Sequence, residues 1–380
     1  MRLLFLQPYG IFHINYIEPI LIKVPAMETD ASQNKIDKLD HEIIALINRR
    51  YELTLASEGQ DNNNPDIVYR PELYSKMLDQ LSNDNSGPMT DTTLRAVYRE
   101  IISGANALMR PHKVSYFGQP GSYTNQAAVK NFGHAVEYVS KPSISDVFKD
   151  IETGRSDYGC VPVENSTEGS VSHTLDRLMN SDVLICAEVN LPIHHHLMAK
   201  CSRDEIKRVY SHIQALGQCR NYLYENMPEV EQIVAASTTQ AAKTVLDEPN
   251  SAAIASYLAA EIFGLDIVES NIEDFSSNTT RFLILGRQET EPTGNDKTSI
   301  CFATKERAGA LYDCLKPLRD AGINMSMIES RPAKTANWEY CFFIDVDGHR
   351  KNAILKEAFA KLEDMCKFFK IIGSYPKIRD

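Results

Sequence analysis

The sequence has no long hydrophobic run, no excess of positive charge and only one tryptophan. No stretch approaches 18 consecutive apolar residues, so no segment is expected to span a membrane as a helix. Lysine and arginine number 40 against 51 aspartate and glutamate, which gives a formal net charge of −11. A general nucleic-acid-binding role is therefore not expected. A small dianion could still bind where arginine, lysine, backbone N–H groups and helix N-termini come together.

Paired cysteine motifs are also missing. The 8 cysteines show neither Cys-x-x-Cys pairs nor a zinc-binding spacing, and most have apolar neighbours, as Cys341 does. This pattern predicts reduced thiols in the core of a cytoplasmic protein. The run His194-His195-His196 is not expected to bind a metal, because adjacent residues of a strand point to opposite faces.

Three helices are expected before the first strand. Apolar residues recur at helical spacing over 33–57, a second helix should follow Pro71 and end near residue 81, and a third should cover 91–108. These segments predict an all-α domain over 30–111. Residues 1–29 are expected to be a disordered extension or to precede the true start, for which Met27 is a candidate.

From residue 113 onward, short strands alternate with helices, which predicts an α/β domain over 113–287 with largely parallel sheets. The expected strands are 114–117, 159–163, 183–193, 208–211, 232–236, 252–255 and 282–285. Ligands of such a domain bind near the carboxyl ends of its strands.

The tail over 297–380 shows a different order, β-α-β-β-α-β, which is typical of an α+β ferredoxin-like domain. Its expected strands are 300–303, 325–330, 339–345 and 369–375, and its expected helices are 310–321 and 354–368.

Several polar segments of the α/β region follow strands and begin helices. The simpler interpretation of each hydroxyl in these segments is a helix N-cap, which contributes about 1 kcal/mol to stability. Together with segments 164–167 and 280–282, and in this order along the chain, they resemble the prephenate dehydratases, in which a Thr-Arg-Phe triplet carries the acid. The resemblance covers about residues 113–286 and implies a two-lobed fold like that of periplasmic binding proteins.

The resemblance also implies roles for individual residues. Thr280 is the expected acid, and Arg281 either assists it or fixes the loop. Glu164 either tunes Thr280 or pairs with a lysine. Because aromatisation drives the reaction of prephenate, no cofactor or metal is implied. The residues implied for catalysis are Thr280, Arg281, Glu164 and Asn165, and those implied for substrate binding are Ser122, Thr124, Ser166, Thr167, Ser211, Gln218, Ser237, Thr238 and Phe282.

The tail contains Gly309-Ala310-Leu311 and Glu329-Ser330-Arg331-Pro332. These segments resemble the two effector-binding motifs of the ACT regulatory domain, which implies phenylalanine as an effector and a homodimer or homotetramer. The implied effector-binding residues are Gly309, Ala310, Leu311, Asn324, Glu329, Ser330, Arg331 and Pro332.

Residues 30–111 resemble chorismate mutase, so residues 30–380 match the architecture of the bifunctional P-protein family. Arg50 matches one arginine of the mutase site, but most other functional positions differ. This predicts a dimerisation module with a vestigial site. A fully bifunctional enzyme, an arogenate dehydratase and a non-catalytic phenylalanine sensor remain alternatives. The departures are Gln33 for an arginine, Asp61 or Gln60 for a lysine, Leu73-Tyr74 for an Arg-Glu pair, and Ala105 and Met109 for a hydroxyl and an amide.

Overall fold

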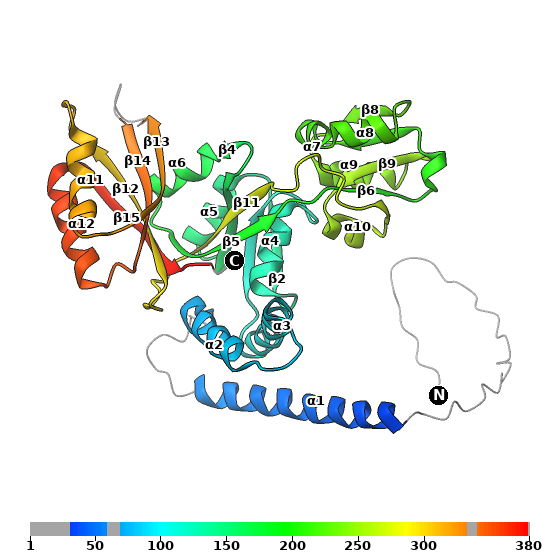
Figure 1. The fold of residues 1–380 in the computed structure, drawn as a ribbon, viewed down its shortest axis with the longest axis horizontal. Coiled ribbons are helices and arrows are strands. Elements are labelled where there is room, and N and C mark those ends of the chain that lie inside the picture. Colours follow the sequence, from blue (N-terminus) through cyan, green and yellow to red (C-terminus); the bar gives the residue numbers. More distant parts are fainter. Residues whose placement is uncertain (1–30, 59–68, 333–339, 379–380) are drawn as a thin grey trace. The chain divides into compact units, whose positions relative to one another are not determined.

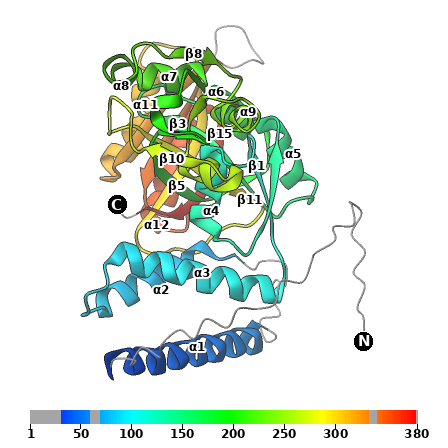
Figure 2. The same ribbon diagram turned by 90° about the vertical axis from the view of Figure 1, so that its right-hand side faces the viewer.

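The computed structural model describes residues 31–58, 69–332 and 340–378, and the predictions made for residues 1–29 lie outside these ranges. Contacts divide the chain into two units, Met1–Leu53 and Thr54–Asp380. The three predicted helices are present as α1 (Ala31–Glu58), α2 (Pro71–Asp84) and α3 (Asp91–Met109). Pro71 opens α2, and the Thr90 side chain caps α3 by accepting a hydrogen bond from Thr93 N. Helices α2 and α3 lie side by side (Figure 2).

Two sheets make up the α/β region (Figure 1). The first has the strand order β2-β1-β3-β11-β5, with the short β4 (Gly169–Ser170) paired to β3, and the second has the order β10-β6-β9-β7-β8. We call the first sheet with its helices the first lobe, and the second sheet with its helices the second lobe. The strands of the first lobe are β1 (Lys113–Phe117), β2 (Glu137–Lys141), β3 (Tyr158–Asn165), β5 (Leu184–Pro192) and β11 (Thr279–Gly286); those of the second are β6 (His196–Ala199), β7 (Arg208–Ser211), β8 (Glu231–Val234), β9 (Ser251–Ala255) and β10 (Asp266–Glu269).

The prediction of largely parallel sheets was only half right. Strand β1 is parallel to β2 and β3, and β7 is parallel to β8 and β9. Strand β11 is antiparallel to both β3 and β5, and β6 is antiparallel to both β9 and β10. The cause is the path of the chain, which leaves the first lobe along β5 and returns along β11. The sequence pattern also missed β2, β4, β6 and β10.

The first sheet separates two hydrophobic cores. On one face, α4 (Tyr123–Phe132) covers Phe282 and Ile284 of β11. On the other face, Leu283 and Leu285 share a core with α5 (Ile144–Glu152), α6 (Ser172–Asn180) and the C-terminal domain. The second lobe carries α7 (Ile213–Gln218), α8 (Arg220–Asn226), α9 (Thr238–Val245) and α10 (Tyr257–Phe263).

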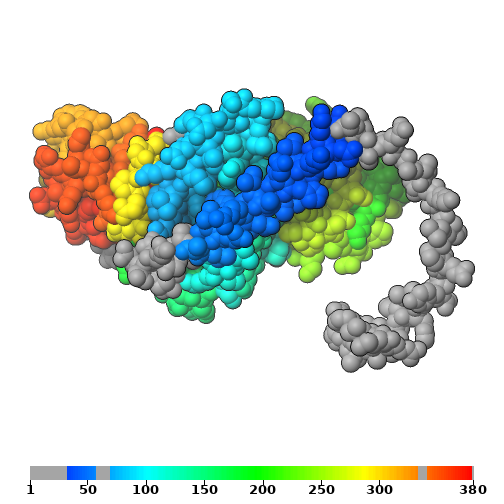
Figure 3. All heavy atoms as spheres, turned by 90° about the horizontal axis from the view of Figure 1, so that it is seen from below, coloured from blue at the N-terminus to red at the C-terminus, as the bar shows by residue number. Residues whose placement is uncertain are grey.

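The C-terminal domain has the predicted β-α-β-β-α-β order and an antiparallel sheet in the order β13-β14-β12-β15. Figure 3 shows this domain, orange to red, adjoining the yellow part of the chain that precedes it. Its sheet packs so closely on the first lobe that a Cβ added to Gly373 would collide with the Ile185 carbonyl oxygen. The elements are β12 (Asp296–Thr304), α11 (Ala310–Asp320), β13 (Met325–Pro332), β14 (Tyr340–Asp347), α12 (Ala353–Met365) and β15 (Cys366–Pro376).

The predicted core thiols are confirmed, because all 8 cysteines are free and most are buried. Within the described ranges, the helices are too short or too polar for any of them to cross a membrane.

Candidate active site at the junction of the two lobes

Thr280 and Asn165 face each other across two neighbouring strands of the first lobe. They are partners in the register of β11 and β3, and Thr280 is buried with 8% of its surface exposed. Asn165 Nδ2 donates hydrogen bonds to Thr280 Oγ1 at 2.7 Å and to Asn278 Oδ1 at 2.8 Å. The two strands therefore bring together the two residues that the sequence placed more than 100 positions apart.

The orientation of the Asn165 amide is determined by backbone donors. Its Oδ1 accepts hydrogen bonds from Thr167 N and Glu168 N, each at 3.0 Å, and from the Thr167 hydroxyl at 2.6 Å. Backbone N–H groups can only donate, so the atom facing them is the amide oxygen and the amide nitrogen faces Thr280. Thr280 Oγ1 accepts this bond, which leaves the hydroxyl hydrogen available for another acceptor.

A hydrogen-bond chain continues from this pair into the second lobe. Asn278 Nδ2 donates to Gln218 Oε1 at 3.1 Å, and the same oxygen lies 2.7 Å from His195 Nε2. Burial lowers the pKa of His195, so the imidazole is neutral and Nε2–H donates to Gln218. The Tyr123 hydroxyl lies 2.6 Å from His195 Nδ1 and 2.9 Å from His194 O, so its single hydrogen is shared between these two acceptors.

Glu273 holds the turn that carries this histidine. Its carboxylate lies 2.7 Å from His194 Nδ1 and accepts a hydrogen bond from His195 N at 2.9 Å. Burial raises the pKa of Glu273, but the bonds from His194 and His195 outweigh burial and lower the pKa overall. His196 instead packs against the ring of Tyr257, so the three consecutive histidines have different partners. Among the described residues, no group of His, Cys, Asp or Glu side chains is arranged to hold a metal ion.

Two residues of the Thr-Arg-Phe triplet lie away from the Thr280–Asn165 pair. Arg281 points to the opposite face from Thr280, because neighbouring residues alternate along a strand, and it ion-pairs with Glu188 and Asp345. Phe282 is 2% exposed and lies in the core beneath α4. The register pairs Glu164 with Arg281, which places Glu164 on the opposite face from Asn165.

Most of the predicted hydroxyl groups organise the backbone. Ser122 and Ser237 are the N-caps of α4 and α9, as the simpler interpretation of these hydroxyls predicted. Thr238 is the first residue of α9, and Thr124 is buried in α4. Ser211 is fully buried, and its hydroxyl donates to Ile254 O at 2.6 Å within the second lobe.

The polar loop that follows β3 is hydrogen-bonded to β11. Ser166 Oγ accepts from Thr279 N at 3.0 Å, and Thr167 orients Asn165 as described above. Sequence reasoning missed Asn278, His195 and Tyr123, although Asn278 directly precedes the Thr279-Thr280 pair and His195 belongs to a conspicuous run.

The predicted effector residues lie at the start of α11, on β13 and in the loop between these two elements. Gly309 has φ of 77° at the start of α11, which continues with Ala310 and Leu311. Asn324 donates to Asp347 Oδ2 at 3.1 Å. Within the described sheet, β13 pairs only with β14. This strand carries Glu329, Ser330, Arg331 and Pro332.

The positions of the mutase resemblance are spread over the three helices. Arg50 and Gln33 lie in α1, where Gln33 Nε2 donates to Asp37 at 3.0 Å, and Gln60 and Asp61 lie outside the described residues. The Tyr74 hydroxyl in α2 bonds to the Asn106 amide in α3, so a tyrosine occupies the position of the expected glutamate in a helix-to-helix contact. Leu73 also lies in α2, and Ala105 and Met109 lie in α3.

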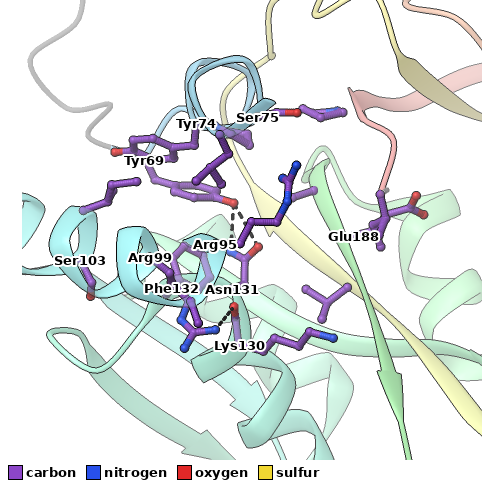
Figure 4. Close-up of a pocket in the computed structure, with 18 of the residues that line it drawn as sticks. Tyr69, Tyr74, Ser75, Arg95, Arg99, Ser103, Lys130, Asn131, Phe132 and Glu188 are labelled. Atoms are coloured by element: carbon purple, nitrogen blue, oxygen red, sulfur yellow. Dashed lines mark hydrogen bonds between the residues drawn. The ribbon is translucent and has the colours of Figure 1, made fainter. Parts of the chain in front are cut away.

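A cavity of about 1000 Å³ lies between the α2–α3 pair and the first lobe (Figure 4). Its cations already have partners. Arg95 ion-pairs with Asp79 and Asp91, while Arg99 ion-pairs with Glu100. Thr280 is not among its lining residues, so this cavity is separate from the candidate active site.

The structure shows a two-lobed α/β domain with a threonine and an asparagine at the lobe junction. Comparisons with known proteins agree with this class of α/β architecture. The family model for prephenate dehydratase matches residues 114–290, and the model for chorismate mutase type II matches residues 33–110. A bifunctional chorismate mutase/prephenate dehydratase from Neisseria gonorrhoeae is 44% identical over 348 residues, covering 90% of this chain and 96% of the relative. The chain belongs to this bifunctional family.

Two solved structures resemble the chain over part of its length. Prephenate dehydratase from Arthrobacter aurescens, in complex with L-Phe, is 31% identical with a TM-score of 0.65, and the match covers 70% of this chain and 90% of that one. GqqA, described as a novel type of quorum quenching acylase, is 28% identical with a TM-score of 0.65, covering 70% and 98%.

Proposed function

We propose that the chain is a prephenate dehydratase and that Thr280 is its proton donor. The observation that supports this most directly is the fixed Asn165 amide, which donates to Thr280 Oγ1 and leaves the threonine hydrogen available. In the reaction this hydrogen passes to the leaving ring hydroxyl, which departs as water. The bond to the ring carboxylate breaks, carbon dioxide leaves, and the electron pair completes the aromatic ring of phenylpyruvate. Thr280 regains a proton from water, so no cofactor is required.

The chain through Asn278, Gln218 and His195 gives the second lobe a part in this site. The amides of this hydrogen-bond chain belong to Asn278, which directly precedes β11, and to Gln218 in α7, and the neutral imidazole lies in the turn before β6. Such groups can orient a polar substrate without placing a charge beside the leaving hydroxyl. An arogenate dehydratase would use the same acid on a substrate with an amino group in place of the keto group. Assays of the purified protein with prephenate, arogenate and chorismate side by side distinguish these activities. If the protein turns over none of the three compounds, the proposal is contradicted.

We further propose that the helical region, residues 30–111, no longer acts as a chorismate mutase, unlike the bifunctional relatives. Each charge-assisted contact to a carboxylate contributes roughly 1.5–3 kcal/mol. Several such contacts are missing at once, because Gln33, Leu73, Tyr74 and Ala105 stand at functional positions of that family. The region would then serve assembly of a homodimer or homotetramer.

The protein is therefore expected not to convert chorismate to prephenate above the uncatalysed rate. Chorismate consumption is measured on the same preparation that dehydrates prephenate, so that an inactive sample is recognised. A mutase kcat comparable to the dehydratase kcat would establish the bifunctional alternative.

We propose that residues 297–380 form a ferredoxin-like ACT domain that binds phenylalanine and inhibits the dehydratase. A Cβ at Gly309 would meet no atom within 4 Å, so there is room for the backbone of a ligand at the start of α11. N–H groups at a helix start can bind a carboxylate. Glu329, on β13 at the edge of the sheet, can meet an ammonium group.

Gly309→Val is expected to raise the phenylalanine concentration for half-inhibition by roughly 10-fold or more, within the usual range of allosteric coupling. Gly322→Val is the matched control, since Gly322 follows the other end of α11, also has positive φ and also faces open space. Both variants carry the same backbone strain. If both remain as sensitive as the wild type, the effector binds elsewhere and competition at Thr280 becomes the better account.

A further inference from the structure

A buried cluster of opposite charges joins the first lobe to the C-terminal domain. It contains Arg281 and Glu188 from the first lobe, and Lys297 and Asp345 from the C-terminal domain. Arg281 lies 2.8 Å from Glu188 and 2.6 Å from Asp345, and Lys297 lies 2.9 Å from Glu188. The side chains are between 1% and 12% exposed, and their formal charges cancel.

Hydroxyl groups of the C-terminal domain complete the contacts of Arg281. Its third nitrogen donates to the Tyr375 hydroxyl at 2.9 Å, and Ser299 joins that hydroxyl to Asp345 Oδ1 at 2.7 and 2.5 Å. Burial raises the pKa of Tyr375, so the phenol stays neutral. The planar guanidinium is therefore held at each of its nitrogens, by β5, β14 and β15, and its rigid fork resists displacement in any direction.

This anchor acts on the strand segment that carries Thr280. Thr280 and Arg281 are neighbours in β11, and the pairing of β11 with β3 shifts register between Arg281 and Phe282. The extra residue of this bulge is Val163 of β3, and β11 keeps an unbroken pairing with β5 from Thr279 to Ile284. The Arg281 side chain adds a further restraint on this segment from the opposite face of the sheet.

The C-terminal domain is itself firmly placed against the first lobe. Its buried residues Phe343 and Ile372 share one core with Leu283 of β11, and Gly373 meets the backbone of β5. We propose that Arg281 is a positioning residue, and that through it the C-terminal domain holds Thr280 in its working position. This inference rests on the proposed function of Thr280.

A positioning role predicts a specific kinetic effect. Removing one member of a buried ion cluster leaves the others uncompensated and shifts the groups they hold. A displacement of about 1 Å at a reacting group can lower a rate by roughly 100-fold. Because Arg281 faces away from Thr280, its loss is expected to lower kcat and to leave KM for prephenate nearly unchanged.

The test uses the full chain and three variants: Arg281→Met, Asp345→Asn and the double variant. Each is expected to lower kcat by roughly 10- to 100-fold, with KM for prephenate within about twofold of the wild type. The double variant is expected to lose little more than either single variant, because both changes break the same ion pair. Asp347→Asn is the control, since Asp347 lies two residues further along β14 and pairs with Lys377 on the surface.

Hydrogen exchange at residues 279–282 gives a readout that does not depend on turnover. Faster exchange in Arg281→Met and Asp345→Asn, but not in Asp347→Asn, supports the anchor. A rise in KM at constant kcat in Arg281→Met would overturn the proposal by showing that the arginine contacts substrate. Wild-type kcat and exchange in Asp345→Asn would also overturn it. An inactive wild type contradicts the proposed function instead, and the exchange comparison still tests the anchor.

Discussion

Replacement of Thr280 by alanine is expected to lower kcat for phenylpyruvate formation by about 100-fold or more, the usual contribution of a positioned general acid. The change removes the hydroxyl that Asn165 orients and leaves the strand pairing of β11 with β3 and β5 in place. Steady-state kinetics with prephenate measures the loss, and circular dichroism checks the fold. Thermal unfolding and phenylalanine binding are expected to stay close to wild type.

Thr279→Ala is the matched control for this experiment. Thr279 precedes Thr280 in the same strand, and its side chain points to the other face. The same loss of a hydroxyl there is expected to leave kcat within about twofold of wild type, because the half-buried Thr279 side chain faces away from Asn165. Near wild-type turnover by Thr280→Ala would remove Thr280 from the mechanism.

Asn165→Asp is expected to lower kcat by about 100-fold as well, although it keeps the shape of the side chain. The carboxylate still accepts from Thr167 N and Glu168 N, but it has no hydrogen to donate to Thr280 Oγ1. The Thr280 hydroxyl then turns to donate to this carboxylate, so its hydrogen is no longer available to the leaving group. The carboxylate also faces Asn278 Oδ1, which strains the connection to Gln218.

The pH profile of this variant is diagnostic. A protonated carboxyl group regains a hydrogen to donate, so kcat of Asn165→Asp relative to wild type should rise as the pH falls towards the pKa of an aspartate, ordinarily about 3.9. Asn226→Asp, an exposed asparagine that donates to Tyr222 O, is the control and should keep the wild-type profile. Wild-type kcat in Asn165→Asp at neutral pH would show that the orientation of Thr280 does not depend on this amide.

Local patterns predicted most of the secondary structure. Helix spacing and Pro71 placed α2, and the apolar period placed α3, each to within a few residues at its ends. The β-α-β-β-α-β order of the tail was also predicted. The prediction of parallel strands was wrong for β11 because strand direction depends on where the chain crosses between lobes. The alternation of strands and helices in the sequence does not show where that crossing occurs.

The functional groups divide in a similar way. Thr280, Asn165 and Gln218 were predicted from the sequence and form one hydrogen-bonded chain. Asn278 and His195 enter this chain only through the fold, because each contacts a residue distant in sequence. The hydroxyls of Ser122 and Ser237 look the same in sequence as ligand-binding groups, but their partners are the first N–H groups of their own helices.

The sequence by itself determined the family to which the protein belongs and its succession of helical, α/β and α+β regions. It also determined the threonine that we propose as the acid. Those properties follow from the order of residues along the chain. Only the tertiary structure decided which face of β11 each residue of the Thr-Arg-Phe triplet occupies and what it meets there. Thr280 faces Asn165, whereas Arg281 reaches Glu188 and Asp345 on another domain. Alternation along a strand separates neighbours, but what lies on each face depends on packing between segments far apart in sequence.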